Sequence, residues 1–313
     1  MRRQLASSRS AVTLNSMSNS LHHPLQFHPA RATAWQLRSQ RLEFGSVPRL
    51  MGIVNTTPDS FSDGGRFLEV EAAVAHGLQL AADGADILDV GGESTRPYSE
   101  AVDEEEELRR VMPVVERLAA QTDVPISIDT SKAAVARAAI AAGAQIINDV
   151  TGLEGDAAML AVAHETGAGV CAMHMAGTPQ TMQDNPHYEK VVSEIASYLT
   201  KRLDALLAAG IDPTKISLDP GIGFGKTHEH NVTLMANCYQ FHEIGCPLLV
   251  GHSRKGFLAK VLDNKEADRT AATMGGAAAL AVQGVQVIRV HDVRPVREAL
   301  LAFEACLAGE LPS

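Results

Sequence analysis

The residues in this chain that could do chemistry recur at one kind of position, at the ends of short apolar runs or just beyond them. Carboxylate and amide side chains can exchange hydrogen bonds with a flat heterocycle that carries amino and amide edges. Arginine, histidine and threonine can hold phosphate oxygens, and arginine can do so with two hydrogen bonds at once. Together these types predict a site for a polar ring attached to a phosphate or diphosphate. The residues concerned are Asn55, Asp89, Thr95, Arg96, Asp129, Asn148, Asp149, Asp219, Ser253, Lys255, Arg289 and His291.

The apolar runs that precede these residues are the expected strands. Eight of them alternate with longer, alanine-rich helical stretches. Apolar strands that alternate with helices indicate a parallel sheet covered by helices, and eight of them over about 250 residues favour a (β/α)8 TIM barrel. A doubly wound open sheet is the alternative. The predicted strands are residues 50–55, 86–90, 125–129, 145–149, 169–174, 216–219, 248–251 and 286–291.

A barrel would bring the polar residues to one face. The carboxyl-terminal ends of all parallel strands lie at the same end, where the following loops build the active site. One polar residue after a strand is explained as a helix cap, but nearly every predicted strand has such residues. A binding site is therefore the better explanation.

Helix boundaries can also be predicted. Asp103 is the expected N-cap of a helix with Glu106 three residues later, so the acidic run 104–107 is interpreted as a first helical turn rather than a binding site. Gly143 and Gly210 stand where helices should end before the next strand.

Charge and composition exclude several classes of partner. The net charge is -10, but residues 1–42 hold six arginines and no lysine or acid, so the rest of the chain carries -16. An acidic body disfavours nucleic acid and anionic membranes as partners. The uncharged stretch 270–288 has few large apolar residues and predicts a helix, a turn and a strand rather than a membrane span. The four cysteines have no C-x-x-C or metal-finger spacing and are interpreted as reduced thiols.

The basic start is expected to be separate from the barrel. Residues 1–46 are predicted to form a disordered extension and residues 47–313 the barrel domain. Residues 1–42 have the composition of an organellar transit peptide. However, this segment shows no clear amphipathic helix. The preferred interpretation is therefore a disordered tail, or an upstream start codon with Met17 as the working start. We expect a cytoplasmic protein, with organellar import as the alternative.

Seven sequence runs resemble those of one enzyme family, the dihydropteroate synthases. They occur in order at the ends of the predicted strands and cover the chain from about residue 50 to 305, which is far more specific than any single motif. The runs are MGIVNTTPDSFSDGG at 51–65, ILDVGGESTRP at 87–97, IDTSK at 128–132, IINDVT at 146–151, LDPGIGFGK at 218–226, GHSRKGF at 251–257 and IRVHDV at 288–293.

The resemblance implies a TIM-barrel transferase that joins a pterin methyl diphosphate to 4-aminobenzoate in folate synthesis, releasing diphosphate. It implies that the pterin diphosphate is held by Thr95, Asp129, Asn148, Asp219, Lys255, Arg289 and His291. It implies an aminobenzoate slot formed by Phe61, Arg96, Pro97, Phe224 and Ser253, with Ser253 at the start of the helix after the seventh strand.

The resemblance also implies how the reaction proceeds. Asn55 would be a ligand of Mg2+, which with Arg289 offsets the charge of the leaving diphosphate. Asp129, Asp63 and Lys255 are the expected catalytic residues. No activated serine, cysteine or histidine is needed, because an arylamine is nucleophilic enough to attack the cation left on the pterin methylene. A homodimer that is a target of sulfonamides is implied as well.

Two other functions stay open. A pterin-binding methyltransferase barrel would share the acids that hold the pterin but would not need a grip on diphosphate, so the segment 55–65 and the turn 253–255 argue against it. A non-catalytic paralogue would be expected to lack residues such as Asn55 or Arg289, which are present.

Some of the polar residues have plain structural explanations. Asp89 and Asp149 could serve only to brace neighbouring loops. His174 is expected to be a packed histidine, and His228 and His230 lack a nearby third ligand for a metal.

Overall fold

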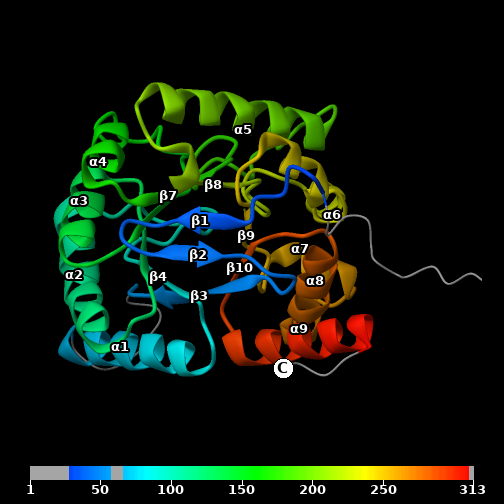
Figure 1. Cartoon of the computed structure of the whole chain (residues 1–313), viewed down its shortest axis with the longest axis horizontal. Coiled ribbons are helices and arrows are strands. Elements are labelled where there is room, and N and C mark those ends of the chain that lie inside the picture. The colour runs from blue at the N-terminus through cyan, green and yellow to red at the C-terminus, as the bar shows by residue number, and fades with distance from the viewer. Residues whose placement is uncertain (1–27, 58–65, 310–313) are drawn as a thin grey trace, which may run out of the picture.

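Eight parallel strands form the centre of the computed structural model, which describes residues 28–57 and 66–309 (Figure 1). Every strand lies where an apolar run predicted it, within one residue at each end. The strands are β3 (Arg49–Asn55), β4 (Ile87–Gly91), β5 (Ile126–Asp129), β6 (Ile146–Asp149), β7 (Gly169–Met173), β8 (Ile216–Asp219), β9 (Leu249–Val250) and β10 (Val287–Val290).

The strands close into a barrel instead of forming an open sheet. In the order β8, β7, β6, β5, β4, β3, β10 and β9, each strand pairs in parallel with the next. The ring is completed between β8 and the residues before β9, where Leu218 forms a parallel bridge with Leu248 and donates its N–H to the carbonyl of Pro247 at 2.9 Å. The TIM-barrel prediction is confirmed, and the doubly wound alternative is excluded because its sheet has two open edges.

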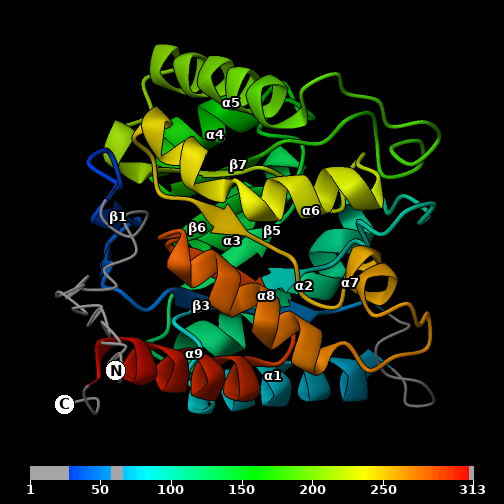
Figure 2. The same cartoon turned by 90° about the vertical axis from the view of Figure 1, so that its right-hand side faces the viewer.

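Helices cover the outside of the barrel (Figure 2). Asp103 caps α2 as predicted, accepting a hydrogen bond from the N–H of Glu106 at 2.8 Å. Gly143 and Gly210 follow the ends of α3 and α5 with φ of +119° and +83°. Within the described residues, no helix combines the length and apolar character that a bilayer span requires. The helices are α1 (Arg66–Ala82), α2 (Glu104–Gln121), α3 (Ala133–Ala141), α4 (Met159–Thr166), α5 (Val191–Ala208), α6 (His228–Ala236), α7 (Gly256–Val261), α8 (Thr270–Val282) and α9 (Val293–Ala308), with 3-10 turns at Pro213–Lys215 and Cys238–Ile244.

The alternation of side chains along each strand separates the core from the site. Outward-facing residues such as Leu88 pack against the helices in the larger apolar cluster. Inward-facing residues of the lower barrel, such as Met51 and Ile87, form a second, smaller cluster. Further along the same inner face of β4 comes Asp89, and on the neighbouring strand comes Asp129. The barrel interior is therefore apolar at its amino-terminal end and polar at its carboxyl-terminal mouth.

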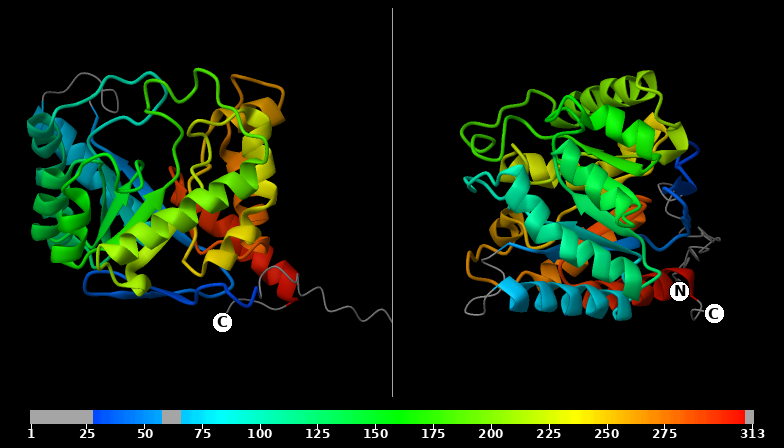
Figure 3. Two further views of the ribbon diagram at one scale, coloured as in Figure 1. Left: turned by 90° about the horizontal axis from the view of Figure 1, so that it is seen from above. Right: turned by 90° about the vertical axis from the view of Figure 1, so that its left-hand side faces the viewer.

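An antiparallel hairpin closes the amino-terminal end of the barrel. It consists of β1 (Ala34–Gln36) and β2 (Arg41–Glu43). Trp35 is fully buried within the lower barrel cluster, and its indole N–H donates to the carbonyl of Lys215 at 2.8 Å. Figure 3 shows the hairpin at one end of the barrel and the loops that follow the strands at the other.

The predicted domain boundary at residue 46 differs from the structure. Residues 28–46 belong to the barrel domain, because Trp35 and Leu37 are buried in its interior. Each hairpin strand has only three residues, too few for their alternation to stand out in an arginine-rich segment. Residues 1–27 lie outside the described part of the chain, and their assignment as an extension stays a prediction.

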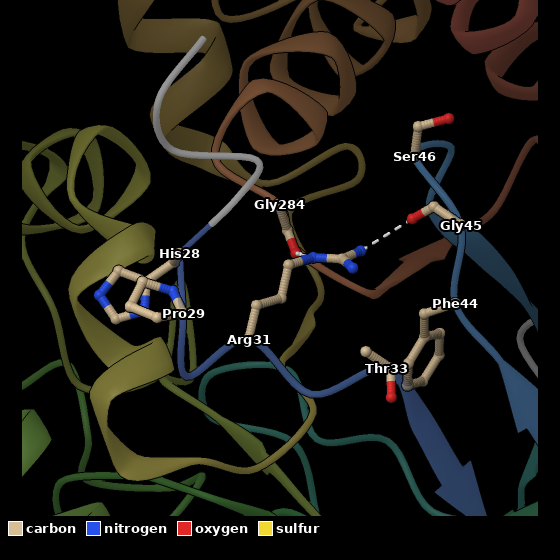
Figure 4. A pocket seen from close by; sticks show the side chains of 8 residues that line it. All are labelled: His28, Pro29, Arg31, Thr33, Phe44, Gly45, Ser46 and Gly284. Atoms are coloured by element: carbon tan, nitrogen blue, oxygen red, sulfur yellow. Dashed lines mark hydrogen bonds between the residues drawn. The ribbon is translucent and has the colours of Figure 1, made fainter. Parts of the chain in front are cut away.

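A cavity of about 340 Å³ lies beside the hairpin, and Arg31 extends across it (Figure 4). The Arg31 guanidinium donates from Nε to the carbonyl of Gly284 at 2.7 Å and from Nη2 to that of Gly45 at 2.9 Å. Because the hairpin is at the amino-terminal end of the strands, this cavity is separate from the mouth where the polar residues gather.

Candidate active site

Arg289 stands at the centre of the polar mouth. It comes from β10 and donates from Nε to Oδ2 of Asp89 at 2.6 Å and from Nη2 to Oδ2 of Asp129 at 2.7 Å. Asn148 donates from Nδ2 to the same oxygen of Asp89 at 3.1 Å. Four strands, β4, β5, β6 and β10, thus each contribute one inward-facing residue to a single hydrogen-bonded network.

Burial and neighbouring charges set the protonation of this network. Burial raises the pKa of Asp129 to about 7, while the positive charge of Arg289 acts in the opposite direction. Burial also raises the pKa of Asp219. For Arg289, burial lowers the pKa, but the carboxylates of Asp89 and Asp129 outweigh it and the net shift is upward. The guanidinium therefore stays charged, and Asp129, with its pKa of about 7, can gain or lose a proton near neutral pH.

Lys255 and Phe224 form the adjoining part of the mouth. Nζ of Lys255 donates to the carbonyl of Ile222 and lies 4.4 Å from the centre of the Phe224 ring. Burial lowers the pKa of Lys255 to about 7, and the carboxylate of Asp219 opposes this shift. Oδ1 of Asp219 accepts from the N–H of Gly221 at 2.7 Å, which fixes the carboxylate at the end of β8. An amine, an acid and an aromatic wall are thereby held together.

Positive charge gathers around His291. Burial lowers the pKa of this imidazole to about 3, so it is neutral at pH 7 and can donate or accept a hydrogen bond. Nearby cations lower the same pKa further. They are Arg289, Arg254, Arg96 and Lys255. Such a concentration of cations around a neutral hydrogen-bonding ring suits a diphosphate.

Ser253 joins this cluster through its side chain. Its buried Oγ accepts from the N–H of His291 at 3.3 Å and lies 3.0 Å from Nδ1 of the same ring. The expectation that Ser253 begins a helix is wrong, because α7 starts at Gly256 with Lys255 as its N-cap. A turn with Arg254 at φ +57° intervenes, so the backbone of Ser253 is not part of a helix N-terminus.

Four other predicted residues lie around the mouth. Asn55 is the last residue of β3 and is half-buried. Thr95, Arg96 and Pro97 lie in the loop after β4, residues 92–103, where Thr95 is half-buried and the other two are exposed. The positive charge of Arg96 is among the causes that lower the pKa of His291, and Pro97 is exposed.

Several expectations need adjustment. Phe61 and Asp63 lie outside the described residues, so neither is placed. Asp89 is more than a loop brace, because it is fully buried and bonded to Arg289. Its position at a predicted strand end is what placed it among the candidate site residues. Asp149 does brace its loop, since Oδ1 accepts from both the N–H and the hydroxyl of Thr151 at 2.8 and 2.7 Å.

A second charge cluster, which the sequence did not single out, lies behind the loop after β4. Nζ of Lys132 donates to Oε2 of Glu93 and to Oε2 of Glu107, each at 2.5 Å. Glu107 is fully buried in the first turn of α2, as part of the acidic run that was expected to begin this helix. Glu93 also accepts from the N–H of Val102 at 3.1 Å and so joins the two ends of the loop 92–103.

The histidines away from the mouth have structural roles. His174 is packed as expected, with its ring edge-on to Tyr198 at 4.7 Å and Nδ1 3.0 Å from Nζ of Lys226. His230 forms a capping box with Thr227 at the start of α6.

Comparison with known proteins places this site in a family. Residues 51–291 match the model of the pterin binding enzyme family. The chain is 46% identical over 265 residues to the dihydropteroate synthase of Escherichia coli strain K12, covering 85% of this chain and 94% of that one.

Solved structures agree in fold as well as in sequence. The dihydropteroate synthase of Yersinia pestis, in a complex with a sulfonamide drug, has a TM-score of 0.82 and 43% identity, covering 88% of this chain and 99% of its own. The enzyme of Xanthomonas albilineans with 4-aminobenzoic acid has a TM-score of 0.82 and 46% identity, with the same coverage. Its complex with 7,8-dihydropteroate gives a TM-score of 0.79 at 44% identity, again with the same coverage.

The family match extends from β3 to the end of β10 and includes each strand end at which the polar residues meet. This protein therefore belongs to the pterin-binding enzyme family, and within it to the dihydropteroate synthases.

Proposed function

We propose that the protein condenses (7,8-dihydropterin-6-yl)methyl diphosphate with 4-aminobenzoate to give 7,8-dihydropteroate and diphosphate. The observation that carries this proposal is the gathering of Asp129 and Asp219 with Arg289 and Lys255 at one barrel mouth. Acids suit the amino groups of a pterin, and cations suit a diphosphate. The Xanthomonas albilineans enzyme, which binds 4-aminobenzoic acid and 7,8-dihydropteroate, supports the choice of substrates.

The pterin ring is proposed to lie among the inward-facing residues Asp129, Asn148 and Asp219, with Lys255 beside it. Asp129 and Asn148 are paired across adjacent strands, and both are linked to the Arg289 network, which supports a shared planar ligand. Burial raises the pKa of Asp129 and Asp219. N–H groups of a bound ring that donate to these carboxylates would act in the opposite direction and favour their ionised forms.

The diphosphate is proposed to lie toward His291, with Thr95 and Arg289 contributing. The cations that lower the pKa of His291 support this direction, since the same charges would attract phosphate oxygens. Arg289 is already held by two carboxylates, so its side chain is oriented before substrate arrives.

The aminobenzoate is proposed to lie against Phe224, with Arg96, Pro97 and Ser253 around it and Phe61 contributing from outside the described residues. The position of Phe224 beside Lys255 supports this slot, because it places an aromatic wall next to the pterin end of the site. The burial of Ser253 supports a hydroxyl that faces ligand rather than solvent.

The reaction that these positions allow is a substitution at the pterin methylene. The carbon–oxygen bond breaks, the diphosphate leaves with both bonding electrons, and Arg289 and Lys255 offset its charge. Asp129 stabilises the cation that spreads from the methylene into the ring, and Asp63, which lies outside the described residues, is proposed to assist. The arylamine nitrogen then forms the new carbon–nitrogen bond and releases one proton to solvent. Bound substrates that fill the mouth would exclude water, which would otherwise compete with the amine.

Magnesium is proposed to assist the departure of diphosphate. Mg2+ typically binds through one or two protein oxygens together with substrate phosphates and water. In the described residues, no group of three histidine, cysteine, aspartate or glutamate side chains could hold a metal alone. The half-buried amide of Asn55 at the mouth fits the substrate-assisted type of site as its neutral oxygen ligand. When bound, the ion would supply positive charge to the leaving group.

The oligomeric state, the cellular compartment and inhibition by sulfonamides are three further proposals. A homodimer is proposed from the resemblance to the dihydropteroate synthases alone. A cytoplasmic location is supported by four free cysteines. Inhibition by sulfonamides is supported by the drug complex of the Yersinia pestis enzyme.

The test is direct assay of the purified protein with Mg2+, the pterin diphosphate and 4-aminobenzoate. We expect equal amounts of 7,8-dihydropteroate and diphosphate, with no product when either organic substrate is omitted. A protein that binds pterin diphosphate but forms no dihydropteroate would be a non-catalytic paralogue, and the proposal would be wrong.

A further inference from the structure

The turn that carries Phe224 is held by an unusual number of side-chain donors. Four consecutive carbonyls, those of residues 222 to 225, each accept a hydrogen bond from a side chain. The donors are Lys255 to Ile222, Gln183 to Gly223 at 3.0 Å, Lys226 to Phe224 at 2.8 Å, and Tyr188 to Gly225 at 2.9 Å. The position of the Phe224 ring therefore depends on residues outside the turn itself.

The glycines in this turn explain why outside support is needed. Gly221, Gly223 and Gly225 have φ of +69°, +85° and +64°, a region that other residues enter at a cost. A Cβ on Gly221 would overlap the carbonyl oxygen of His174, and one on Gly225 would lie 2.7 Å from Cβ of Ala176. The turn is thus packed closely against the loop after β7, and its flexible backbone is fixed by that loop.

Two of the four donors come from this same loop, residues 174–190. Gln183 and Tyr188 are both half-buried. The Tyr188 ring lies edge-on to His230 at 5.1 Å, which orients its hydroxyl toward the turn. Burial raises the pKa of Tyr188 to about 12, so its hydroxyl keeps the proton that it donates.

The loop 174–190 also contacts the loop 92–103 on the other side of the mouth. The N–H of Tyr98 donates to the carbonyl of Pro179 at 3.1 Å, and Nε2 of Gln180 donates to the carbonyl of Ser99 at 3.2 Å. The loop after β7 is therefore a bridge between the two segments that would flank the aminobenzoate, one carrying Phe224 and the other Arg96 and Pro97.

We propose that Gln183 and Tyr188 are positioning residues that hold the Phe224 turn in the shape required to bind 4-aminobenzoate. The inference rests on the proposed function, which places Phe224 in the aminobenzoate slot. Gln183 and Tyr188 bond the carbonyls on either side of Phe224, whereas Asp219 and Lys255 bond the earlier residues Gly221 and Ile222. The larger effect of the two donors is therefore expected on 4-aminobenzoate.

The test uses Gln183→Met and Tyr188→Phe, which remove one donor each and keep the side-chain volume close to the original. Loss of one net hydrogen bond should raise the KM for 4-aminobenzoate about three- to tenfold per variant. The KM for the pterin diphosphate and kcat at saturating substrates should change less than about twofold. The double variant should show the larger rise.

Tyr198→Phe is the matched control. It removes a tyrosine hydroxyl that bonds Glu154 at 2.9 Å and not a carbonyl of the Phe224 turn, and it should leave both KM values unchanged. Unchanged KM for 4-aminobenzoate in an active Gln183→Met, Tyr188→Phe double variant would overturn the inference. An equal rise in the KM values of both substrates, together with a lowered melting temperature, would also overturn it, because that pattern indicates a merely structural role. Lack of turnover in the unmodified protein would instead refute the proposed function together with the inference.

Discussion

Arg289 and Asp89 form an ion pair inside the barrel, with Nε of the guanidinium 2.6 Å from Oδ2 of a carboxylate that is fully buried. The two residues come from strands that are separated by β3 in the sheet. This ion pair across the interior orients the guanidinium toward the mouth, where Nη2 of Arg289 donates to Oδ2 of Asp129. Asp89 thus orients Arg289, the residue proposed to bind substrate, without needing to reach the substrate itself.

Replacing Asp89 with asparagine tests this orientation. We expect kcat/KM for the pterin diphosphate to fall about tenfold or more, because the guanidinium loses a charged anchor and its geometry. The free energy of unfolding should fall by about 2 to 3 kcal/mol, less than for a buried pair broken completely, since Asp129 still offsets the charge. Steady-state kinetics and urea unfolding measure the two effects. A variant with normal kinetics would show that Asp89 does not orient Arg289.

Replacing Lys255 with alanine should weaken binding of the pterin diphosphate while the fold stays intact. Burial lowers the pKa of Lys255 to about 7, so in the free protein the ammonium loses its proton as the pH rises through 7. Affinity should therefore decrease from pH 7 to pH 9. A Lys255→Arg variant, which stays charged, should lose this alkaline decrease even if its affinity is lower. Calorimetric titration measures both, and unchanged affinity in the alanine variant would refute the role.

The Lys132 cluster should contribute to stability far more than a surface pair. Replacing Lys132 with methionine leaves Glu93 and the buried Glu107 without their shared cation, which should cost about 3 to 5 kcal/mol of unfolding free energy. Arg137→Met removes the exposed pair with Glu165 and should cost less than about 1 kcal/mol. Equal effects of the two substitutions in denaturant unfolding would contradict this account of the cluster.

Buried neutral histidines should make the fold less stable in acid. Burial lowers the pKa of His252 to about 4, below the value near 6.5 of an unfolded chain. Between these values the unfolded state binds the extra proton, so stability decreases as the pH falls from about 6.5 toward 4. His252→Gln should show a smaller decrease over this window than the unmodified protein. A decrease in His252→Gln identical to that of the unmodified protein would exclude His252 as a source.

The hairpin should be required for folding, in contrast to the residues before it. Trp35 is fully buried, and Trp35→Ala should cost about 3 to 5 kcal/mol. Removal of residues 1–46 should therefore destabilise the protein, while a chain that begins at residue 28 should retain its turnover. Thermal unfolding and activity of the two truncated forms check this. A stable, active form without residues 1–46 would restore the boundary that the sequence suggested.

The strands of the barrel could be predicted because each is an apolar run with a polar residue at its end. Ile87, Leu88 and Val90 bury both faces of β4, while Asp89 interrupts the run at an inward position. The hairpin could not be predicted in this way. Trp35 and Leu42 occur in strands of three residues, and their burial depends on contact with a barrel base formed by distant segments.

The site was predictable to the extent that strand ends carry it. Asp129, Asn148, Asp219 and Arg289 meet because topology brings strand ends together. The donors Gln183 and Tyr188 could not be predicted, because they lie in an irregular loop with no periodic pattern. Their role follows only from which carbonyls the folded turn presents to them.

The most direct measurement is a crystal structure of the protein with the pterin diphosphate. We predict the ring among Asp129, Asn148 and Asp219 at the carboxyl-terminal mouth, with the diphosphate directed toward Arg289 and His291. A ligand bound elsewhere, for example in the cavity beside Arg31 at the hairpin end of the barrel, would contradict the assignment of the site.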